Sequence, residues 1–483
     1  MQLNHYADWF LFYNMSKVCL ISDPKAKGGG KLKHHESIIG ELNNYIVRNV
    51  TASVGLSIYI LIDTLFISMA AGAMGLTVLN LALPIYSLFS CTGLLLGVGG
   101  AAYFSLNKID HPERVKTLYS ELVIFAVLLG TAVIILINLF TRPLATILGA
   151  NDQTMGMAIK YLRLMSIDAP VTMANYISVN FIRNDNHPGL TMRAALIESV
   201  VVIIFDWFFI FGLHLQIEGA ALAAVVSPAT SLIVLSFHKR FPYRQLEWHW
   251  VWPRLKTLKT AAKLGVSACL NELSTGVSIY VFNMVLLKLS GNYAVAAYGV
   301  ISNIAIVTVA IANGVALGVQ PLASREYGTR HFRNVRLALR HGIKITAAIA
   351  VLAFVALVVF RHPIITLFNH DHSLQLTRYA MAGMPIYFTS TLFSAINLLM
   401  IIFLTAINCA TLSFSLSLLR GYVVLLPAII LMGWLFGING VWAAVPVTEL
   451  LITLVGFFLV HQQDHRLKLM EDAQRKANLT KSA

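Results

Sequence analysis

Two aspartates within long apolar runs are the side chains of this sequence best placed to do chemistry. Asp63 lies in "GLSIYILIDTLFIS" and Asp206 in "VVVIIFDWFFIFG". A charge inside a membrane-spanning helix costs about 2.5–3.5 kcal/mol on insertion scales, so such an acid suggests a function. Their helices are expected to enter the membrane near Arg48 and Pro188. Along the helix axis, Asp63 then lies about 22 Å from Arg48, and Asp206 lies about 27 Å from Pro188. At this shared depth the pair could bind H⁺ or Na⁺, unless neighbouring amides or hydroxyls simply satisfy both acids in a structural core.

Three further polar residues could extend a path from this pair. Glu198 lies two turns before Asp206 on the same helix, and Asp168 lies in another apolar run. Thr64 offers a hydroxyl that could help to coordinate Na⁺. For Glu198 a hydrogen bond that packs helices together is an equal alternative, and for Asp168 a structural role is equally compatible with the sequence.

The second part of the chain carries its own buried charges. Arg420 and Glu449 both fall near the middle of predicted spans, which favours a buried structural ion pair. Glu272 lies about 13 Å into its span and is a further candidate for the wall of a cavity. "GLSIYILID" ends in Asp63, whereas the similar "GVSIYVFNM" reaches Met284 without an acid. One part of the chain is therefore expected to bind the coupling ion, and the other to supply mainly cavity wall.

The elements that must position these residues are membrane-spanning helices. The chain of 483 residues is 57% hydrophobic and only 12% charged, far from the composition of soluble domains. About 20 apolar helical residues cross a bilayer, and runs of this length recur after residue 45. We predict an all-α membrane protein with twelve spans, at 46–70, 77–104, 117–140, 157–182, 189–213, 217–238, 262–289, 294–322, 340–361, 375–404, 410–437 and 439–461.

An internal repeat divides these spans into two groups of six. "GLSIY" at 55–59 returns as "GVSIY" at 276–280, and "TGLLLGVGGAA" at 92–102 and "IEGAALAA" at 217–224 have counterparts at the same offset of 221 residues. Six spans per repeat place both repeats in the same orientation, so we predict two parallel, pseudo-symmetric lobes. The expected organisation is a tail at 1–45, a first lobe at 46–239, a linker at 240–261, a second lobe at 262–461 and a tail at 462–483.

The distribution of basic residues orients the protein. Lys and Arg concentrate in alternate connections, such as 239–263 and 325–344, and are missing from "AAGAMG", "LHLQIEG" and "LSGN". This asymmetry predicts a multi-pass protein of the cell membrane with both termini in the cytosol, and it explains the net charge of +14 without a nucleic-acid partner. The N-terminal segment has no signal-peptide pattern, and either Met1 or Met15 could be the native start.

No motif for a cofactor, a metal or nucleotide hydrolysis accompanies these features. The four cysteines are far apart, so neither a disulfide framework nor zinc-ligand spacing emerges. The fifteen histidines are expected in tails, loops or helix ends, which argues against an enzyme active site within the spans. We expect a monomeric membrane protein without a cofactor, which uses H⁺ or Na⁺ as its coupling ion and small molecules as its substrates.

Several stretches together resemble the multidrug and toxic compound extrusion family, in the branch that includes the DNA-damage-inducible F type. They include "YILIDTLFIS", "FIRNDNHPGLTM", "FDWFFIFGLHLQIEGAALA" and "LLRGYVVLLPAIILMGWLFGINGVWAAVP". The resemblance implies export of amphipathic, often cationic compounds in exchange for H⁺ or Na⁺, with the family's two acids at Asp63 and Asp206. The chain departs from the family pattern at Val202, where an Asn is frequent, at Asn186, where Gly is favoured, and at Asp168, where a small residue is favoured.

Other functions remain as alternatives to an ion-coupled exporter. A flippase for a lipid-linked saccharide could share the two-lobed architecture, but it would need several Arg and Lys in its cleft for phosphates. Arg420 is the one basic residue clearly within a span. A membrane-embedded enzyme would need converging His, Ser or metal ligands, and the sequence places none together.

Overall fold

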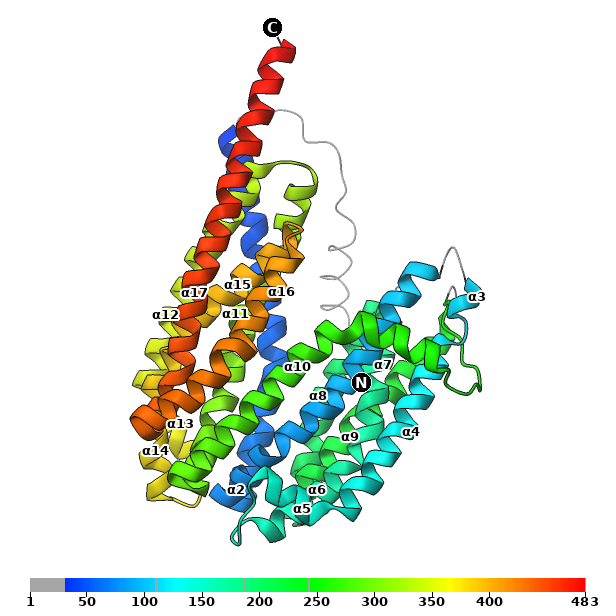
Figure 1. The fold of residues 1–483 in the computed structure, drawn as a ribbon, viewed down its shortest axis with the longest axis vertical. Coiled ribbons are helices and arrows are strands. Elements are labelled where there is room, and N and C mark those ends of the chain that lie inside the picture. Colours follow the sequence, from blue (N-terminus) through cyan, green and yellow to red (C-terminus); the bar gives the residue numbers. More distant parts are fainter. Residues whose placement is uncertain (1–30, 109–111, 186, 242–243, 483) are drawn as a thin grey trace, which may run out of the picture. The chain divides into compact units, whose positions relative to one another are not determined.

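The computed structural model describes residues 31–108, 112–185, 187–241 and 244–482, and these contain helices and no strands (Figure 1). The chain forms two compact units, Met1–Glu41 and Leu42–Ala483. The described part of the first unit is helical from residue 31. The predicted tail at 1–45 and the choice between Met1 and Met15 therefore lie largely outside the described residues. All that follows concerns the second unit.

The helices of the first lobe follow the six predicted spans. They are α2 (Lys31–Asn107), α3 (Pro112–Val115), α4 (Leu118–Leu139), α5 (Thr141–Leu148), α6 (Met155–Ser166), α7 (Asp168–Asn184), α8 (Pro188–Trp207) with the π-helical turn η1 (Phe208–Gly212), and α9 (Gln216–Ser236) with η2 (Phe237–Arg240). α2 holds the first two predicted spans, which are separated at Gly72. There the backbone adopts φ 57° and ψ −151°, a conformation that is open to glycine and costly for other residues.

The second lobe repeats this order after an extended linker. Its helices are α10 (Leu255–Ser290), α11 (Asn292–Gly328), α12 (Phe332–Val359), α13 (Arg361–Phe368), α14 (Leu374–Phe388), α15 (Thr391–Ala406), α16 (Ala410–Leu418) with the π-helical turn η3 (Leu419–Val424), and α17 (Leu425–Ser482). α10 begins seven residues before the predicted span at 262. α17 continues as a helix through most of the predicted tail at 462–483.

The described helices account for all twelve predicted spans. By length and apolarity, eight helical runs could each cross a membrane, and the pair α14 and α15, bent by 44°, makes a ninth. Two of the eight runs, those containing α2 and α17, each hold two predicted spans, separated at Gly72 and Gly437. The remaining span at 157–182 is the pair α6 and α7, which is interrupted at Ile167.

The backbone follows the sequence repeat, including its irregular points. The break between α6 and α7 at Ile167 has its counterpart between α14 and α15, where Thr389 and Ser390 separate the two helices. The eight-residue helices α5 and α13 also occupy matching places. Gln216 and Gly437, 221 residues apart, both have positive φ, at 51° and 61°. Pseudo-symmetry therefore extends from the sequence to individual turns.

Each lobe has its own apolar core. One cluster of buried hydrophobic residues lies entirely within 67–261. A second cluster spans 282–444 and adds only Ala73 and Leu76, which lie just before the second predicted span. Burial of these side chains gives each lobe a continuous interior, as expected for two structural repeats.

Glycine pairs allow close helix packing in both lobes, but against different partners. A Cβ on Gly97 would lie 2.9 Å from the carbonyl oxygen of Tyr176 in α7. A Cβ on the equivalent Gly318 would lie 2.6 Å from Cα of Ile46 in the first span. The glycine spacing therefore does permit close approach. The partner of the second-lobe glycine Gly318, however, is the first span, which belongs to the first lobe.

Candidate functional site

The structure brings Asp63 of α2 and Asp206 of α8 into side-chain contact. Their carboxyl groups lie within hydrogen-bonding distance of each other. Asp206 is fully buried, and no N–H or O–H group of the described residues donates to either of its oxygens. Two adjacent carboxylates repel each other, and a buried one without donors is poorly solvated. The arrangement therefore favours a shared proton or a bound cation.

A tyrosine that the sequence did not single out lies beside this pair. Tyr161 of α6 is 6% exposed and is within electrostatic range of Asp63, Asp206 and Asp168. Asp168 begins α7 directly after the break at Ile167, and both of its carboxylate oxygens accept from the hydroxyl of Thr172, at 2.8 and 2.9 Å. Tyr161 lies between Lys160 and Arg163, and nothing in that stretch indicated that its ring would meet the acids, which is why sequence reasoning missed it.

Glu198 of α8 joins this group from the other side. Its carboxylate accepts long hydrogen bonds from the amide of Asn175, at 3.3 and 3.5 Å, which connect α8 to α7. It also lies within electrostatic range of Asp168 and of Tyr59, and Tyr59 in turn neighbours Asp63. Both predicted roles, a packing contact and an extension of the polar path, are thus compatible with its position.

Thr64, the further ligand candidate from the sequence, makes a hydrogen bond within its own helix, and Val202 departs from the family pattern as expected. The hydroxyl of Thr64 donates to the carbonyl of Ile60 at 2.8 Å, within its own helix. Val202, which occupies the place of the family's frequent Asn, is a buried apolar residue of α8. Asn186 lies outside the described residues.

In the second lobe, Arg420 and Glu449 form the predicted ion pair. Nη2 and Nε of Arg420 lie 2.6 and 2.8 Å from Oε1 of Glu449. Oε2 of Glu449 accepts from the amide of Asn397 at 2.7 Å, and the oxygen of that amide accepts from Thr453 at 3.0 Å. The Glu449 side chain is only 6% exposed, and Arg420 supplies the charge that balances it within this network.

This ion pair lines a cavity of about 480 Å³ between helices of the second lobe. Serine and threonine hydroxyls share the wall with the aromatic rings of Phe282, Tyr298 and Tyr387. Phe282 and Tyr298 are stacked, with ring centroids 4.7 Å apart. A cavity of this size, with apolar faces and a few polar groups, suits an organic small molecule.

Glu272 does not belong to this cavity, contrary to our expectation. Asn271, Ser274 and Thr275 of α10 line it, whereas Glu272 is absent from its wall and lies within electrostatic range of Tyr176 in α7. One residue along a helix turns the side chain by about 100°, so the neighbour of a lining residue can face the opposite lobe.

Both lobes place a charged site residue at a π-helical turn. Asp206 lies two residues before η1, and Arg420 lies within η3. The wider turn of a π-helix shifts the register of the side chains that follow, and such turns recur at functional sites. No pattern in the sequence indicated either turn.

The linker is attached to the first lobe through Asp185, at the end of α7. Its carboxylate accepts from the backbone N–H groups of Gln245 and Leu246, at 3.1 and 3.3 Å. Burial by itself raises the pKa of Asp185, but the adjacent imidazole of His238 and these two amides outweigh it, so the pKa lies below its ordinary value.

A second attachment joins the end of the linker to α4. The buried carboxylate of Glu121 receives the guanidinium of Arg254 at 2.5 to 3.2 Å and the backbone N–H of Arg254 at 3.1 Å. Hydrogen bonds to Glu121, and then its charge, raise the pKa of Arg254. The linker is therefore held to the first lobe at both ends of its extended part.

A disulfide corrects our expectation about the cysteines. Cys91 of α2 and Cys269 of α10 are bonded, with Cα atoms 4.4 Å apart, although 178 residues separate them. The pair joins the two lobes. Our expectation was wrong because the spacing along the chain carries no information about which helices of two lobes meet.

Two repeated helical lobes, a group of buried acids in one and a polar cavity in the other define a multi-pass membrane transporter. Comparison with known proteins gives the same class. The MatE family model matches residues 50–208 and 268–431, about two thirds of the chain. The chain belongs to this family, whose members are transporters rather than enzymes, and the predicted family is thereby confirmed.

Relatives and solved structures agree with this assignment. The multidrug export protein MepA of Staphylococcus saprophyticus is 28% identical over 418 residues, covering 85% of this chain and 90% of MepA. An inward-facing structure of a multidrug resistance MATE family transporter superimposes with a TM-score of 0.77 at 20% identity, covering 86% and 95% of the two chains. The structure of the MATE multidrug transporter DinF-BH, solved as a complex, superimposes with a TM-score of 0.69 at 21% identity, covering 91% of this chain and 98% of that one. These structures share the fold of this chain.

Proposed function

We propose that this chain exports amphipathic organic cations in exchange for protons, and that the coupling proton binds between Asp63 and Asp206. The observation that carries the proposal is the contact of these two carboxyl groups, with Asp206 buried and without a hydrogen-bond donor among the described residues. One proton between them removes the like-charge repulsion and supplies the missing donor. Loss of that proton restores the repulsion, which gives the first lobe two states of different energy.

A proton fits this pair better than Na⁺. A hard cation takes several oxygen ligands beyond two carboxylates, and the hydroxyl of Thr64, the further candidate from the sequence, is oriented by its hydrogen bond to the carbonyl of Ile60 within its own helix. Val202 supplies no polar atom. A proton needs only the two carboxylates, which are already in contact.

The charges of both lobes support a cationic substrate. Asp63, Asp206, Asp168 and Glu198 form no ion pair with any Lys or Arg of the described residues. The aromatic rings of the second-lobe cavity offer faces to which organic cations bind. The names of the MepA relatives, multidrug export proteins, agree with a broad range of substrates.

A flippase for lipid-linked saccharides is less well supported. Phosphate groups would need several basic side chains in the cavity. Among the residues that line it, Arg420 is the one basic side chain, and Glu449 neutralises it. We therefore retain the exporter as the proposed function.

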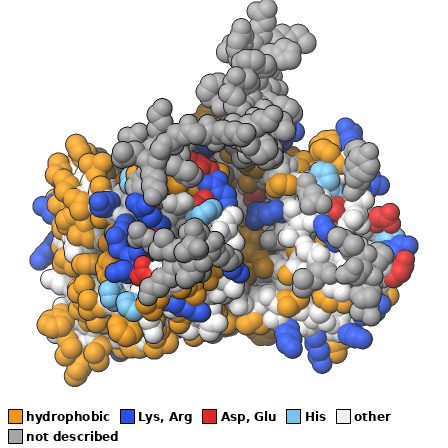
Figure 2. All heavy atoms as spheres, turned by 90° about the horizontal axis from the view of Figure 1, so that it is seen from above, with side chains coloured by type: hydrophobic (Ala, Val, Ile, Leu, Met, Phe, Trp, Pro, Cys, Tyr) orange, Lys and Arg blue, Asp and Glu red, His pale blue; other side chains and the backbone are white. Residues whose placement is uncertain are grey.

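The surface supports an orientation with the end of α17 in the cytosol. Figure 2 shows Lys and Arg side chains gathered on the face viewed along the long axis from that end. The excess of basic residues at the cytosolic ends of membrane helices is the usual determinant of orientation. We propose that this face is cytosolic, in the cell membrane.

Purified protein in proteoliposomes tests the coupling. A pH gradient and a Na⁺ gradient are imposed separately, and uptake of a fluorescent organic cation is followed. We expect a response to the pH gradient alone. Asp63→Asn and Asp206→Asn should each reduce gradient-driven transport at least about tenfold, because a neutral amide cannot take up and release the proton.

Asp152→Asn is the matched control, because Asp152 is an exposed carboxylate away from the pair. Size-exclusion chromatography checks that every variant is folded. Transport by Asp63→Asn and Asp206→Asn at the parent rate would refute the assignment of these residues. A response to the Na⁺ gradient alone would refute proton coupling.

A further inference from the structure

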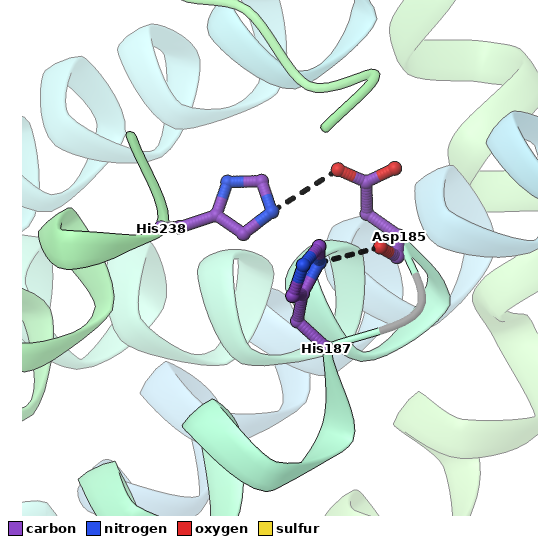
Figure 3. A group of neighbouring side chains, drawn as sticks. All are labelled: Asp185, His187 and His238. Atoms are coloured by element: carbon purple, nitrogen blue, oxygen red, sulfur yellow. Dashed lines mark hydrogen bonds and ion pairs between the residues drawn. The ribbon is translucent and has the colours of Figure 1, made fainter. Parts of the chain in front are cut away.

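A group of metal-ligating side chains, two of them buried and the third half-buried, lies outside the transport site, where the linker meets the first lobe. Asp185 follows α7, His187 immediately precedes α8, and His238 lies in η2 (Figure 3). One ligand atom from each residue lies within 4.8 Å of the other two. Asp185 and His238 are 2% and 5% exposed. Two imidazoles and a carboxylate are thus directed to one small volume.

The hydrogen bond of His187 leaves one of its nitrogens free to bind a metal. Nδ1 lies 2.7 Å from the backbone carbonyl oxygen of Asp185. Figure 3 draws this contact as a dashed line. A carbonyl oxygen only accepts, so Nδ1 carries the hydrogen and Nε2 keeps its lone pair. Metal-ligating histidines usually donate their other N–H to a carbonyl or carboxylate in this way, which sets both tautomer and ring orientation.

His238 presents a buried nitrogen to the same volume. Its Nε2 lies 3.1 Å from Oδ2 of Asp185, an ion-pair contact that Figure 3 draws as a dashed line. Nε2 of His238 and a carboxylate oxygen of Asp185 therefore face each other, and both are atom types that bind a divalent transition metal. The rings of His187 and His238 are nearly perpendicular, with centroids 4.8 Å apart, so they do not stack across the space between them.

We propose that Asp185, His187 and His238 form a binding site for a divalent transition metal, with Zn²⁺ as the best match. Two imidazole nitrogens and one carboxylate oxygen are ligands that Zn²⁺ prefers, with water completing a tetrahedron. At Zn–N distances of about 2.0–2.1 Å, tetrahedral ligand atoms lie about 3.3 Å apart. The present separations, up to 4.8 Å, therefore need only small side-chain rotations to close.

The position of this site gives it a structural consequence. Asp185 also accepts from the backbone N–H groups of Gln245 and Leu246, and His238 immediately precedes the linker. Binding of a metal would tie the beginning of the linker to the end of α7 and the start of α8. We infer that the metal stabilises the attachment of the linker to the first lobe, and that it takes no part in ion coupling. Asp185 and His187 are only two residues apart, but His238 follows 51 residues later, so no ligand spacing was visible in the sequence.

The test measures metal binding by the full-length protein, purified through a tag that contains no histidine. After removal of bound metal with a chelator, Zn²⁺ is titrated in competition with a chromophoric chelator. We expect one Zn²⁺ per chain. His187→Ala and His238→Gln should each weaken Zn²⁺ binding about 100-fold or more. Mutation of a residue that only hydrogen-bonds to a metal ligand already lowers metal affinity about 10- to 100-fold, and loss of the ligand itself should cost at least as much.

His249→Ala is the matched control, since His249 lies in the linker but outside the cluster, and it should bind Zn²⁺ like the parent. Glutamine at 238 keeps a hydrogen-bond donor beside Asp185, so a purely structural histidine would tolerate this change. Co²⁺ in place of Zn²⁺ should give the visible absorption of a tetrahedral site in the parent. Failure of the parent to bind Zn²⁺ at micromolar concentration, or equal binding by the parent and both variants, would overturn the proposal. Neither result depends on transport, so the exporter function is tested separately.

Discussion

The ion pair of the second lobe allows the most quantitative prediction. Glu449→Ala removes the acceptor of the two Arg420 contacts, at 2.6 and 2.8 Å, and of the Asn397 bond at 2.7 Å. It leaves a guanidinium without its counter-ion, and breaking a buried pair in this way costs about 3–5 kcal/mol. The Arg420 side chain keeps 24% exposure towards the cavity, so we expect the lower end, about 3 kcal/mol.

The opposite single change should cost at least as much. Arg420→Ala leaves the carboxylate of Glu449, which is 6% exposed, with Asn397 as its remaining side-chain donor. The double variant Arg420→Met with Glu449→Leu removes both charges. The double variant should lose only about 1–3 kcal/mol of stability, the cost of leaving one N–H of the buried Asn397 amide without its carboxylate acceptor. The sum of the two single losses of stability should therefore exceed the loss in the double variant, with a coupling energy of about 3–5 kcal/mol.

Equilibrium unfolding in mixed micelles with an increasing fraction of a denaturing detergent measures these free energies. The parent, the two alanine variants, the two matching single variants Arg420→Met and Glu449→Leu, and the double variant are compared. Losses that simply add, or single variants as stable as the parent, would show that the pair does not stabilise the second lobe. The reasoning from its contacts would then be wrong.

Two further changes probe contacts between the lobes. Gly72→Ala would put a Cβ 1.5 Å from Oδ2 of Asp371, at a residue whose φ of 57° is unfavourable for alanine. We therefore expect a clear fall in melting temperature. Gly189→Ala is the control, because a Cβ at Gly189 would meet open space, and it should have little effect. Asn292→Ala removes two amide hydrogen bonds to Asn151, at 2.8 and 3.0 Å. Each is worth about 1 kcal/mol, so hydrogen exchange around Asn151 should rise about 30-fold, and unchanged exchange would contradict a role for this contact.

The two lobes share a backbone plan but have different chemistry. The first lobe gathers four acids without a basic partner among the described residues, and the second balances its acid with Arg420. The sequence indicated this division, because Asp63 has no acidic counterpart after "GVSIY". The structure adds the cavity on the second-lobe side, which places the proposed proton and the proposed substrate site in different lobes.

Properties that depend on position along one helix could be read from the sequence. Apolar run length marked the spans, and the offset of 221 residues marked the two lobes. Distance along a helix rise placed Asp63 and Asp206 at one depth and Arg420 near Glu449. These predictions succeeded because a membrane helix has nearly constant rise and must satisfy its own backbone hydrogen bonds.

Properties that depend on which helix faces which were decided only by the tertiary structure. The proximity of Tyr161 to the acids, the turn of Glu272 away from the cavity, the bond between Cys91 and Cys269, and the meeting of His187 with His238 had no sequence signal. A span that is apolar on every face has no polar stripe, so its sequence does not reveal how the helix is rotated about its axis. Packing of small residues, breaks and π-helical turns sets that rotation, and these arise from contacts between segments far apart in the chain.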